Sequence, residues 1–233
     1  MFNSVKRDLA KQKNSAKAKI LARFFKTGKG EYGEGDVFLG VSVPKQRKTA
    51  KKYIDANLRD VERLLQSKIH EHRLTALLIV VAKYQRADDG DKKEIVNFYL
   101  RNTRWINNWD LVDLSAEKIL GAHLIDKDKS LLYKLAKSNN LWERRIAILS
   151  TFYFIKNNQF ADALKISEIL LNDGHDLIHK AAGWMLREIG KRDQEITEKF
   201  LSKHCQKMPR TMLRYAIEKY PGSKRKLYLA FRK

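Results

Sequence analysis

Short amphipathic segments separated by turn residues run along almost the whole chain, and this pattern most constrains the fold. The breaks carry Asp, Asn and Gly, as in Asp88–Asp91 and Asn172–Gly174, and no stretch alternates with the period of a strand. So many short helices cannot all pack against one central core. The sequence therefore predicts an all-α, HEAT-like α-solenoid of about six antiparallel helix pairs with a concave basic face. A compact helical bundle is the alternative.

The expected helices lie at residues 4–27 (one helix or two), 42–56, 58–69, 71–86, 91–103, 109–124, 129–138, 141–156, 159–171, 175–190, 193–204, 209–220 and 224–231. Ser42 is expected to cap the second of these segments, with Pro44 in its first turn. No long Ser-, Pro- or Gly-rich linker interrupts the series. Residues 1–233 are therefore predicted to form a single domain.

Composition excludes several classes of protein. With 43% hydrophobic residues, the chain is not a disordered basic tail. No apolar run approaches the roughly 18 residues of a membrane-spanning helix, and the N-terminus lacks the apolar region of a secretory signal. A single cysteine, Cys205, excludes an internal disulfide framework and a cysteine-based zinc cluster. We therefore expect a protein of the reducing cytoplasm.

The charge is large and unevenly distributed. The chain has 48 basic and 27 acidic residues, a formal net charge of +21, which implies an anionic partner such as nucleic acid or an acidic membrane surface. Residues 1–53 have a net charge of +10 and residues 203–233 one of +9, whereas the segment between them is nearly neutral. In both basic ends the cations alternate with large apolar residues, which is typical of folded amphipathic helices. Because these helices continue the repeat, the membrane interpretation is set aside.

Two polar residues interrupt apolar helix faces in the neutral middle of the chain. Trp109 and Asp113 are four residues apart, so they share one helix face, which Leu120 continues. In the structural interpretation Asn108 or Asp110 caps this helix and Asp113 is solvated. Arg145 lies on an apolar stripe and needs a partner. That partner is either a carboxylate, with Asp113 or Asp110 as candidates, or the phosphate of a ligand.

A third position of this kind is Trp184, at the edge of the apolar stripe of its helix. Its neighbours on that face include the cations Arg187 and Lys191. The structural interpretation stacks the indole under Arg187 by a cation–π contact. Together, two tryptophans, one carboxylate and one arginine on successive helix pairs of a basic protein indicate a candidate nucleic-acid site.

Other motifs carry less weight. The segment Gly28–Gly35 is rich in glycine, but no Gly-Lys-Ser/Thr follows it, so it is not a Walker loop. His70 and His72 cannot share a helix face, and no third ligand accompanies His175 and His179. Cys205 lacks the sequence context of a nucleophile. We therefore predict no metal site and no cofactor.

Five stretches occur in an order that resembles the AlkD-like DNA alkylation repair family of HEAT-like-repeat DNA glycosylases. They are residues 38–47 (FLGVSVPKQR), 107–113 (NNWDLVD), 141–149 (LWERRIAIL), 180–188 (KAAGWMLRE) and 208–218 (MPRTMLRYAIE). The resemblance implies excision of N3- and N7-alkylated purines, such as 3-methyladenine and 7-methylguanine, from double-stranded DNA in base excision repair. It also implies no metal or organic cofactor, and a protein of the bacterial cytoplasm that is associated with the nucleoid. A monomer is expected, because one solenoid can wrap a duplex.

The resemblance implies roles for individual residues as well. Trp109 and Trp184 would pack on the deoxyribose and backbone at the lesion, and Asp113 would lie near the anomeric carbon. Arg145 would bind the adjacent phosphate. The residues implied to contact the DNA backbone are Arg47, Lys51, Arg187 and Lys191. Phe24 is a departure, because the family's best-known members have a tyrosine there.

Two other classes of function remain open at this level. A non-catalytic helical-repeat protein could bind damaged, bent or branched DNA with the same cations, but it would not need the carboxylate of Asp113. A protein–protein scaffold of the general HEAT kind would have to bind an acidic partner to account for the charge of +21. The set of Trp109, Asp113, Arg145 and Trp184 favours the enzyme.

Overall fold

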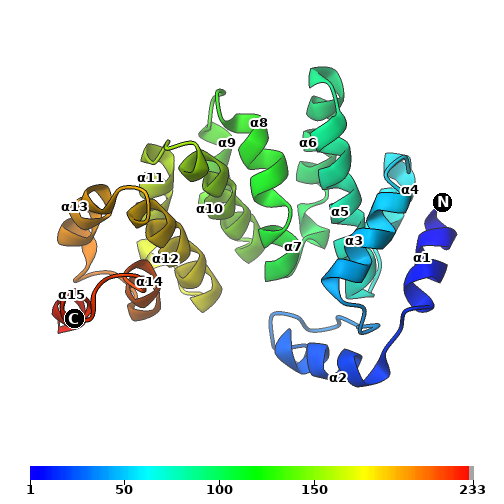
Figure 1. Cartoon of the computed structure of the whole chain (residues 1–233), viewed down its shortest axis with the longest axis horizontal. Helices are drawn as coiled ribbons and strands as arrows, with labels where there is room; N and C mark the ends of the chain where they lie inside the picture. Colours follow the sequence, from blue (N-terminus) through cyan, green and yellow to red (C-terminus); the bar gives the residue numbers. More distant parts are fainter. Residues whose placement is uncertain (231–233) are drawn as a thin grey trace. The chain divides into compact units, whose positions relative to one another are not determined.

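The computed structural model describes residues 1–230, and these are helical apart from turns, loops and one isolated bridge between Val37 and Ile69 (Figure 1). The α-helices are α1 (Phe2–Ala10), α2 (Ser15–Phe24), α3 (Val43–Lys52), α4 (Leu58–Leu65), α5 (His70–Arg86), α6 (Asp89–Arg101), α7 (Trp109–Asp113), α8 (Ala122–Leu124), α9 (Ser130–Ala136), α10 (Leu141–Lys156), α11 (Ala161–Ile169), α12 (Asp176–Gly190), α13 (Gln194–His204), α14 (Arg210–Ala216) and α15 (Gly222–Ala230). The short turns are η1 (Thr103–Trp105), η2 (Glu117–Gly121) and η3 (Leu170–Asn172). The all-α prediction is confirmed; residue 231 of the last expected helix lies outside the described residues.

The chain divides into two compact units, one of Met1–Ser115 and one that begins at Ala116. The prediction of a single domain stays a prediction. In the N-terminal unit α5 is the central helix, and α1, α3, α4, α6 and α7 all pack against it. Thirteen of its seventeen residues are buried, so the core of this unit lies around α5.

The C-terminal unit is built around α10 and α12. The first packs against η2, α9, α11 and α12, and the second also against α13 and α14. Gly183 lies where α12 meets α14, and a Cβ there would come 2.4 Å from the carbonyl oxygen of Met212. Gly121 likewise meets the carbonyl oxygen of Ser150 on α10. Backbone therefore packs directly on backbone at both contacts, which only glycine allows.

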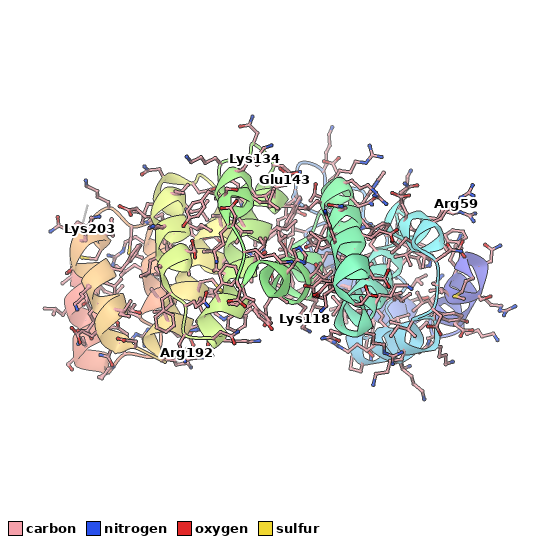
Figure 2. All side chains as sticks on the ribbon, turned by 90° about the horizontal axis from the view of Figure 1, so that it is seen from above. Arg59, Lys118, Lys134, Glu143, Arg192 and Lys203 are labelled. Atoms are coloured by element: carbon pink, nitrogen blue, oxygen red, sulfur yellow. The ribbon has the colours of Figure 1, made fainter. Side chains whose placement is uncertain are left out.

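The exposed surface of each unit is rich in cations. Figure 2 shows Arg59 on α4 and Lys203 on α13 extending away from the ribbon, and both side chains are exposed.

No helix within residues 1–230 has the length and apolarity to cross a membrane.

The helix expected at 109–124 is interrupted, which corrects that prediction. The helix α7 ends at Asp113, and the chain resumes in the π-helical turn η2 before α8. The hydroxyl of Ser115 donates to the carbonyl of Leu111 at 2.5 Å and also bonds the Tyr99 hydroxyl at 3.0 Å. Serine competes for backbone groups in this way, and it often ends or bends a helix.

The first two expected helices also differ in detail from the structure. Residues 4–27 form two helices rather than one, which the sequence left open, and the second is capped by the side chain of Asn14. Pro44 lies in the first turn of α3, as expected. Ser42 is the N-cap residue, but its side chain makes no capping hydrogen bond, contrary to the expectation.

The loop before α3 depends on Gly40. Its φ of +83° lies in the region that favours glycine, and a Cβ there would come 2.1 Å from the carbonyl oxygen of Asn14. The buried carboxylate of Glu71 holds the same loop by accepting the N–H groups of Leu39, Gly40 and Val41 at 2.9, 2.7 and 3.2 Å. This bond set links α5 to the loop.

We therefore expect Gly40→Ala to lower the free energy of unfolding by more than the roughly 1–3 kcal/mol that a strained φ alone costs. The clash with Asn14 adds to that strain. Gly174→Ala is the matched control, because a Cβ at Gly174 meets nothing within 4 Å and its φ is not positive. Urea unfolding followed by circular dichroism measures both variants. Equal stability of the two variants would contradict this account of Gly40.

Candidate nucleic-acid site

The short helix α7 carries two of the predicted site residues, Trp109 and Asp113, at its two ends. The side chain of Asn108 caps it by accepting the N–H of Trp109 at 2.8 Å, as the structural interpretation expected of either Asn108 or Asp110. Trp109 and Asp113 are both half-buried. Burial raises the pKa of Tyr99, and the charge of Asp113 raises it further, so the carboxylate of Asp113 lies near this buried phenol.

Trp109 belongs to a stack of rings that we call the aromatic stack: Phe24, Phe25, Phe38, His70 and Trp109. The indole of Trp109 is stacked on Phe25, with ring centroids 5.0 Å apart and an interplanar angle of 12°. Phe25 in turn stacks on Phe38 at 5.1 Å. Phe24 meets Trp109 edge-on at 5.7 Å and is 61% exposed. The stack therefore fixes one face of Trp109 and leaves an apolar ring beside it at the surface.

Beneath the aromatic stack lies a buried ionic cluster, the His70 network, formed by Asp36, His70, Arg73 and Asp110. The ring nitrogens of His70 bond Asp36 at 3.0 Å (Nδ1) and Asp110 at 2.9 Å (Nε2). Arg73 donates to both carboxylate oxygens of Asp36, at 2.6 and 2.7 Å. Both partners of His70 are carboxylates, which only accept, so the ring donates from both nitrogens and is an imidazolium.

The protonation states of the His70 network follow from its contacts. Burial alone would lower the pKa of His70, but the charge and hydrogen bond of Asp110 and the hydrogen bond to Asp36 raise it above its ordinary value. Burial alone would raise the pKa of Asp36, but the bonds to His70 and Arg73 hold it below its ordinary value. Two positive and two negative groups therefore neutralise one another in the core.

The His70 network ties α7 to α5. Asp110 lies in the first turn of α7, directly after Trp109, and its bond to His70 fixes the rotation of this five-residue helix. The orientation of both Trp109 and Asp113 depends on that rotation. This cluster was not predicted from the sequence, where His70 was considered only as a metal ligand. The available signal was a histidine and an arginine, His70 and Arg73, three residues apart on one face at the start of a helix whose middle is mostly apolar.

In the C-terminal unit Arg145 is buried, with 4% of its surface exposed. Its guanidinium donates to the carbonyl of Leu177 at 2.5 Å, from α10 to the first turn of α12. A buried cation on an apolar stripe was expected to have a partner, and Leu177 supplies one acceptor. The predicted contact of Arg145 with phosphate stays a prediction.

Trp184 lies half-buried on α12, with its ring 5.5 Å from that of Phe152. Its Nε1–H donates to the carboxylate of Glu188 at 3.2 Å. Within residues 1–230 no cation–π contact joins Trp184 to Arg187; the Arg187 guanidinium bonds the carboxylates of Glu218 and Glu188 instead. The charged partner of Trp184 is therefore Glu188 and not Arg187, the residue expected from the sequence.

The carboxylate of Glu188, on α12, has several cationic partners. Lys191 bonds its carboxylate at 2.7 Å, and Arg192 lies 3.6 Å from it. Burial alone would raise the pKa of Glu188, but the hydrogen bonds from Lys191 and Trp184 and the charges of Lys191 and Arg187 hold it below its ordinary value. The two predicted backbone-contacting cations at the end of this helix are Arg187 in its last turn and Lys191, its C-cap residue, and both are paired with carboxylates in this structure.

The other two predicted backbone contacts, Arg47 and Lys51, lie one turn apart on α3 in the N-terminal unit. Both are exposed, whereas Gln46, Thr49 and Ala50 on the opposite side of the helix are buried. In the part of the chain that the structure describes, neither cation makes an ion pair or side-chain hydrogen bond. They are therefore available to an external anion.

Comparison with known proteins identifies the family. A family model described as "DNA alkylation repair enzyme" matches residues 5–220. A solved structure, described as a predicted DNA alkylation repair enzyme from Enterococcus faecalis, superposes with a TM-score of 0.70 at 17% sequence identity and covers 91% of this chain and 98% of its own. The comparison with curated protein sequences finds no match. Because the family model covers most of its length, the chain belongs to the DNA alkylation repair enzyme family.

Proposed function

We propose that this chain is a DNA glycosylase that hydrolyses the N-glycosidic bond of cationic N3- and N7-alkylated purines in double-stranded DNA. The observation that carries the proposal is the half-buried carboxylate of Asp113, held on α7 with Trp109, in a basic chain of this family. DNA binding alone needs the cations but gives no reason for a carboxylate at this position. The proposed place of action is DNA in the bacterial cytoplasm.

The proposed chemistry needs few groups. A purine alkylated at N3 or N7 is already positively charged, so it leaves without protonation by a general acid. As it leaves, positive charge develops on the deoxyribose, with the oxocarbenium character known from glycoside hydrolysis. In the proposal the carboxylate of Asp113 stabilises that charge and accepts a proton from the attacking water. The products are the free base and an abasic site.

The aromatic stack suits a sugar-binding role for Trp109. Because Phe25 lies parallel to the indole at 5.0 Å, the opposite face of Trp109 has a fixed direction. The π face of an indole attracts positive charge, and the ring excludes water from one side of the sugar. In the C-terminal unit, Trp184 is proposed to pack on the backbone in the same way, with Arg145 binding phosphate.

The test is base release from methylated duplex DNA. We expect the wild-type chain to release 7-methylguanine and 3-methyladenine from a duplex treated with a methylating agent, and no base from the untreated duplex. Chromatography of the ethanol-soluble fraction measures the free bases. Binding of the duplex without release of either base would exclude the glycosylase and leave the alternative of a damage-binding helical-repeat protein.

Two arginine variants test the proposed contacts with the DNA backbone. Each of Arg47→Ala and Arg187→Ala is expected to weaken binding to all duplex sequences equally and to reduce the salt slope, the slope of log affinity against log salt, by about one. Arg187 has carboxylate partners and Arg47 has none, so the effect of Arg47→Ala is expected to be the larger. Fluorescence anisotropy at several salt concentrations measures both. An unchanged slope would remove that arginine from the interface.

A further inference from the structure

A second basic surface lies in the N-terminal unit, beside the one that carries Arg47 and Lys51. Two adjoining depressions, of about 340 and 210 Å³, lie where α1 ends, α2 begins and α3 passes. They share Lys11, Gln12 and Lys45 in their walls, so they form one groove. We call it the lysine groove, and its cations are Lys11, Lys13, Lys17, Lys45, Lys48 and Lys52.

The lysine groove carries a large unbalanced charge. Its one carboxylate, Asp8, already accepts the hydroxyl of Tyr53 at 3.0 Å and lies 3.6 Å from Lys52. The other five ammonium groups make no ion pair or hydrogen bond within residues 1–230. Gln12, by contrast, is held by hydrogen bonds to the carbonyl of Asp8 and the hydroxyl of Thr49. The polar side chain in the groove is therefore fixed in place, whereas the positive charge of the lysines around it is not neutralised.

Five unpaired cations around one hollow repel one another, and an anion that enters it relieves that repulsion. The anion must be extended and carry several charges, because the lysines come from α2, from α3 and from the turn between α1 and α2. A nucleic-acid backbone has this chemistry, with regularly spaced phosphates and no need for directional contacts, and lysine binds phosphate as a point charge. The starts of α2 and α3 border the groove and add positive helix-dipole ends.

The helix α2 fixes the distance between the lysine groove and the candidate site. Its N-cap residue Asn14 lines the groove, and its last residue, Phe24, contacts Trp109. Ten residues of α-helix span about 15 Å. At 3.4 Å for each base pair, this is about four or five base pairs of duplex.

We propose that the lysine groove binds the phosphate backbone of duplex DNA about four or five base pairs to one side of the nucleotide at Trp109. The position of the groove relative to that nucleotide rests on the proposed function. The affinity of the groove for duplex DNA is independent of it. The chain should therefore need flanking duplex on one side of a lesion more than on the other.

The first test uses undamaged duplex DNA of 24 base pairs and three proteins. The groove variant carries Lys11→Gln, Lys45→Gln and Lys48→Gln. The control variant carries Lys93→Gln, Lys134→Gln and Lys165→Gln, three exposed lysines on α6, α9 and α11, so both variants have the same net charge. The groove variant is expected to reduce the salt slope by about two to three relative to wild type, because each lost phosphate contact contributes about 0.9. The control variant should change it by less than one.

The second test locates the contact. Wild-type binding is measured on duplexes that contain an abasic site and are shortened to three base pairs on one side or on the other. Shortening one side is expected to weaken wild-type binding about tenfold or more and to leave the groove variant unchanged, and shortening the other side should affect both proteins equally.

The outcomes separate the two proposals. An equal salt slope for the groove and control variants would overturn the groove as a DNA contact, even if methylated bases are released normally. Symmetric loss on shortening would overturn its position relative to Trp109. Failure of base release together with the expected change in salt slope would reject the glycosylase and leave the groove as a duplex-binding surface.

Discussion

Replacing Asp113 by asparagine is expected to reduce the rate of 7-methylguanine release by about 100-fold or more. The amide has the same shape as the carboxylate, but it is neutral, so it neither stabilises the developing oxocarbenium charge nor accepts a proton from water. Affinity for undamaged duplex DNA should stay within about threefold of wild type, because the cations that bind phosphate are unchanged. Single-turnover release with enzyme in excess separates the chemical step from binding.

The control for this variant is Asp126→Asn, which neutralises an exposed carboxylate in the turn after α8. It should release base at the wild-type rate. Release by Asp113→Asn within about threefold of wild type would remove Asp113 from the chemistry. A parallel loss of duplex affinity would instead indicate that the substitution disturbs α7, which circular dichroism and thermal unfolding would detect.

Helices with a continuous apolar stripe could be predicted from the sequence almost to the residue. The expected segments 141–156 and 71–86 correspond to α10 and α5. Local periodicity is sufficient there, because both helices are central to their units and bury most of their length. The segment 109–124 has the same apolar pattern, but the competition of Ser115 for backbone carbonyls interrupts it. A pattern of apolar residues does not record where a hydroxyl bonds.

Of the candidate site, only the pairs of residues that lie within one turn of the same helix could be predicted from the sequence. The four-residue spacing of Trp109 and Asp113 is visible in the sequence, and so is the one between Trp184 and Glu188. The His70 network that orients the helix of Trp109 is not visible in the sequence, because Asp36 and Asp110 lie 34 and 40 residues from His70 in the chain. Nothing local in the sequence specifies which of the many carboxylates meets which cation. The roles of Arg145 and the other predicted DNA contacts stay predictions for the same reason.

The second large effect is expected for His70→Leu, which should lower the free energy of unfolding by about 3–5 kcal/mol, the usual cost of removing one partner from a buried ionic pair. The His70 side chain is 2% exposed, and leucine leaves Asp110 in the core without this cation. Asp36 keeps its bonds to Arg73. Base release should fall together with stability, because α7 loses its tie to α5. Urea unfolding at pH 6.5 measures the loss.

The pH dependence distinguishes this charged role from simple packing. Because the folded-state pKa of His70 is raised, its protonation stabilises the folded chain fully below the unfolded pKa of about 6.5 and progressively less as pH rises through the folded pKa. The stability difference between wild type and His70→Leu should therefore shrink above that pH. His72 is the matched control on the same helix: burial lowers its pKa to about 4, so it is neutral above pH 7 and its variant His72→Gln should show a constant difference from wild type there. A constant difference for His70→Leu between pH 6 and 9 would show that the ring is neutral and would contradict the imidazolium in the His70 network.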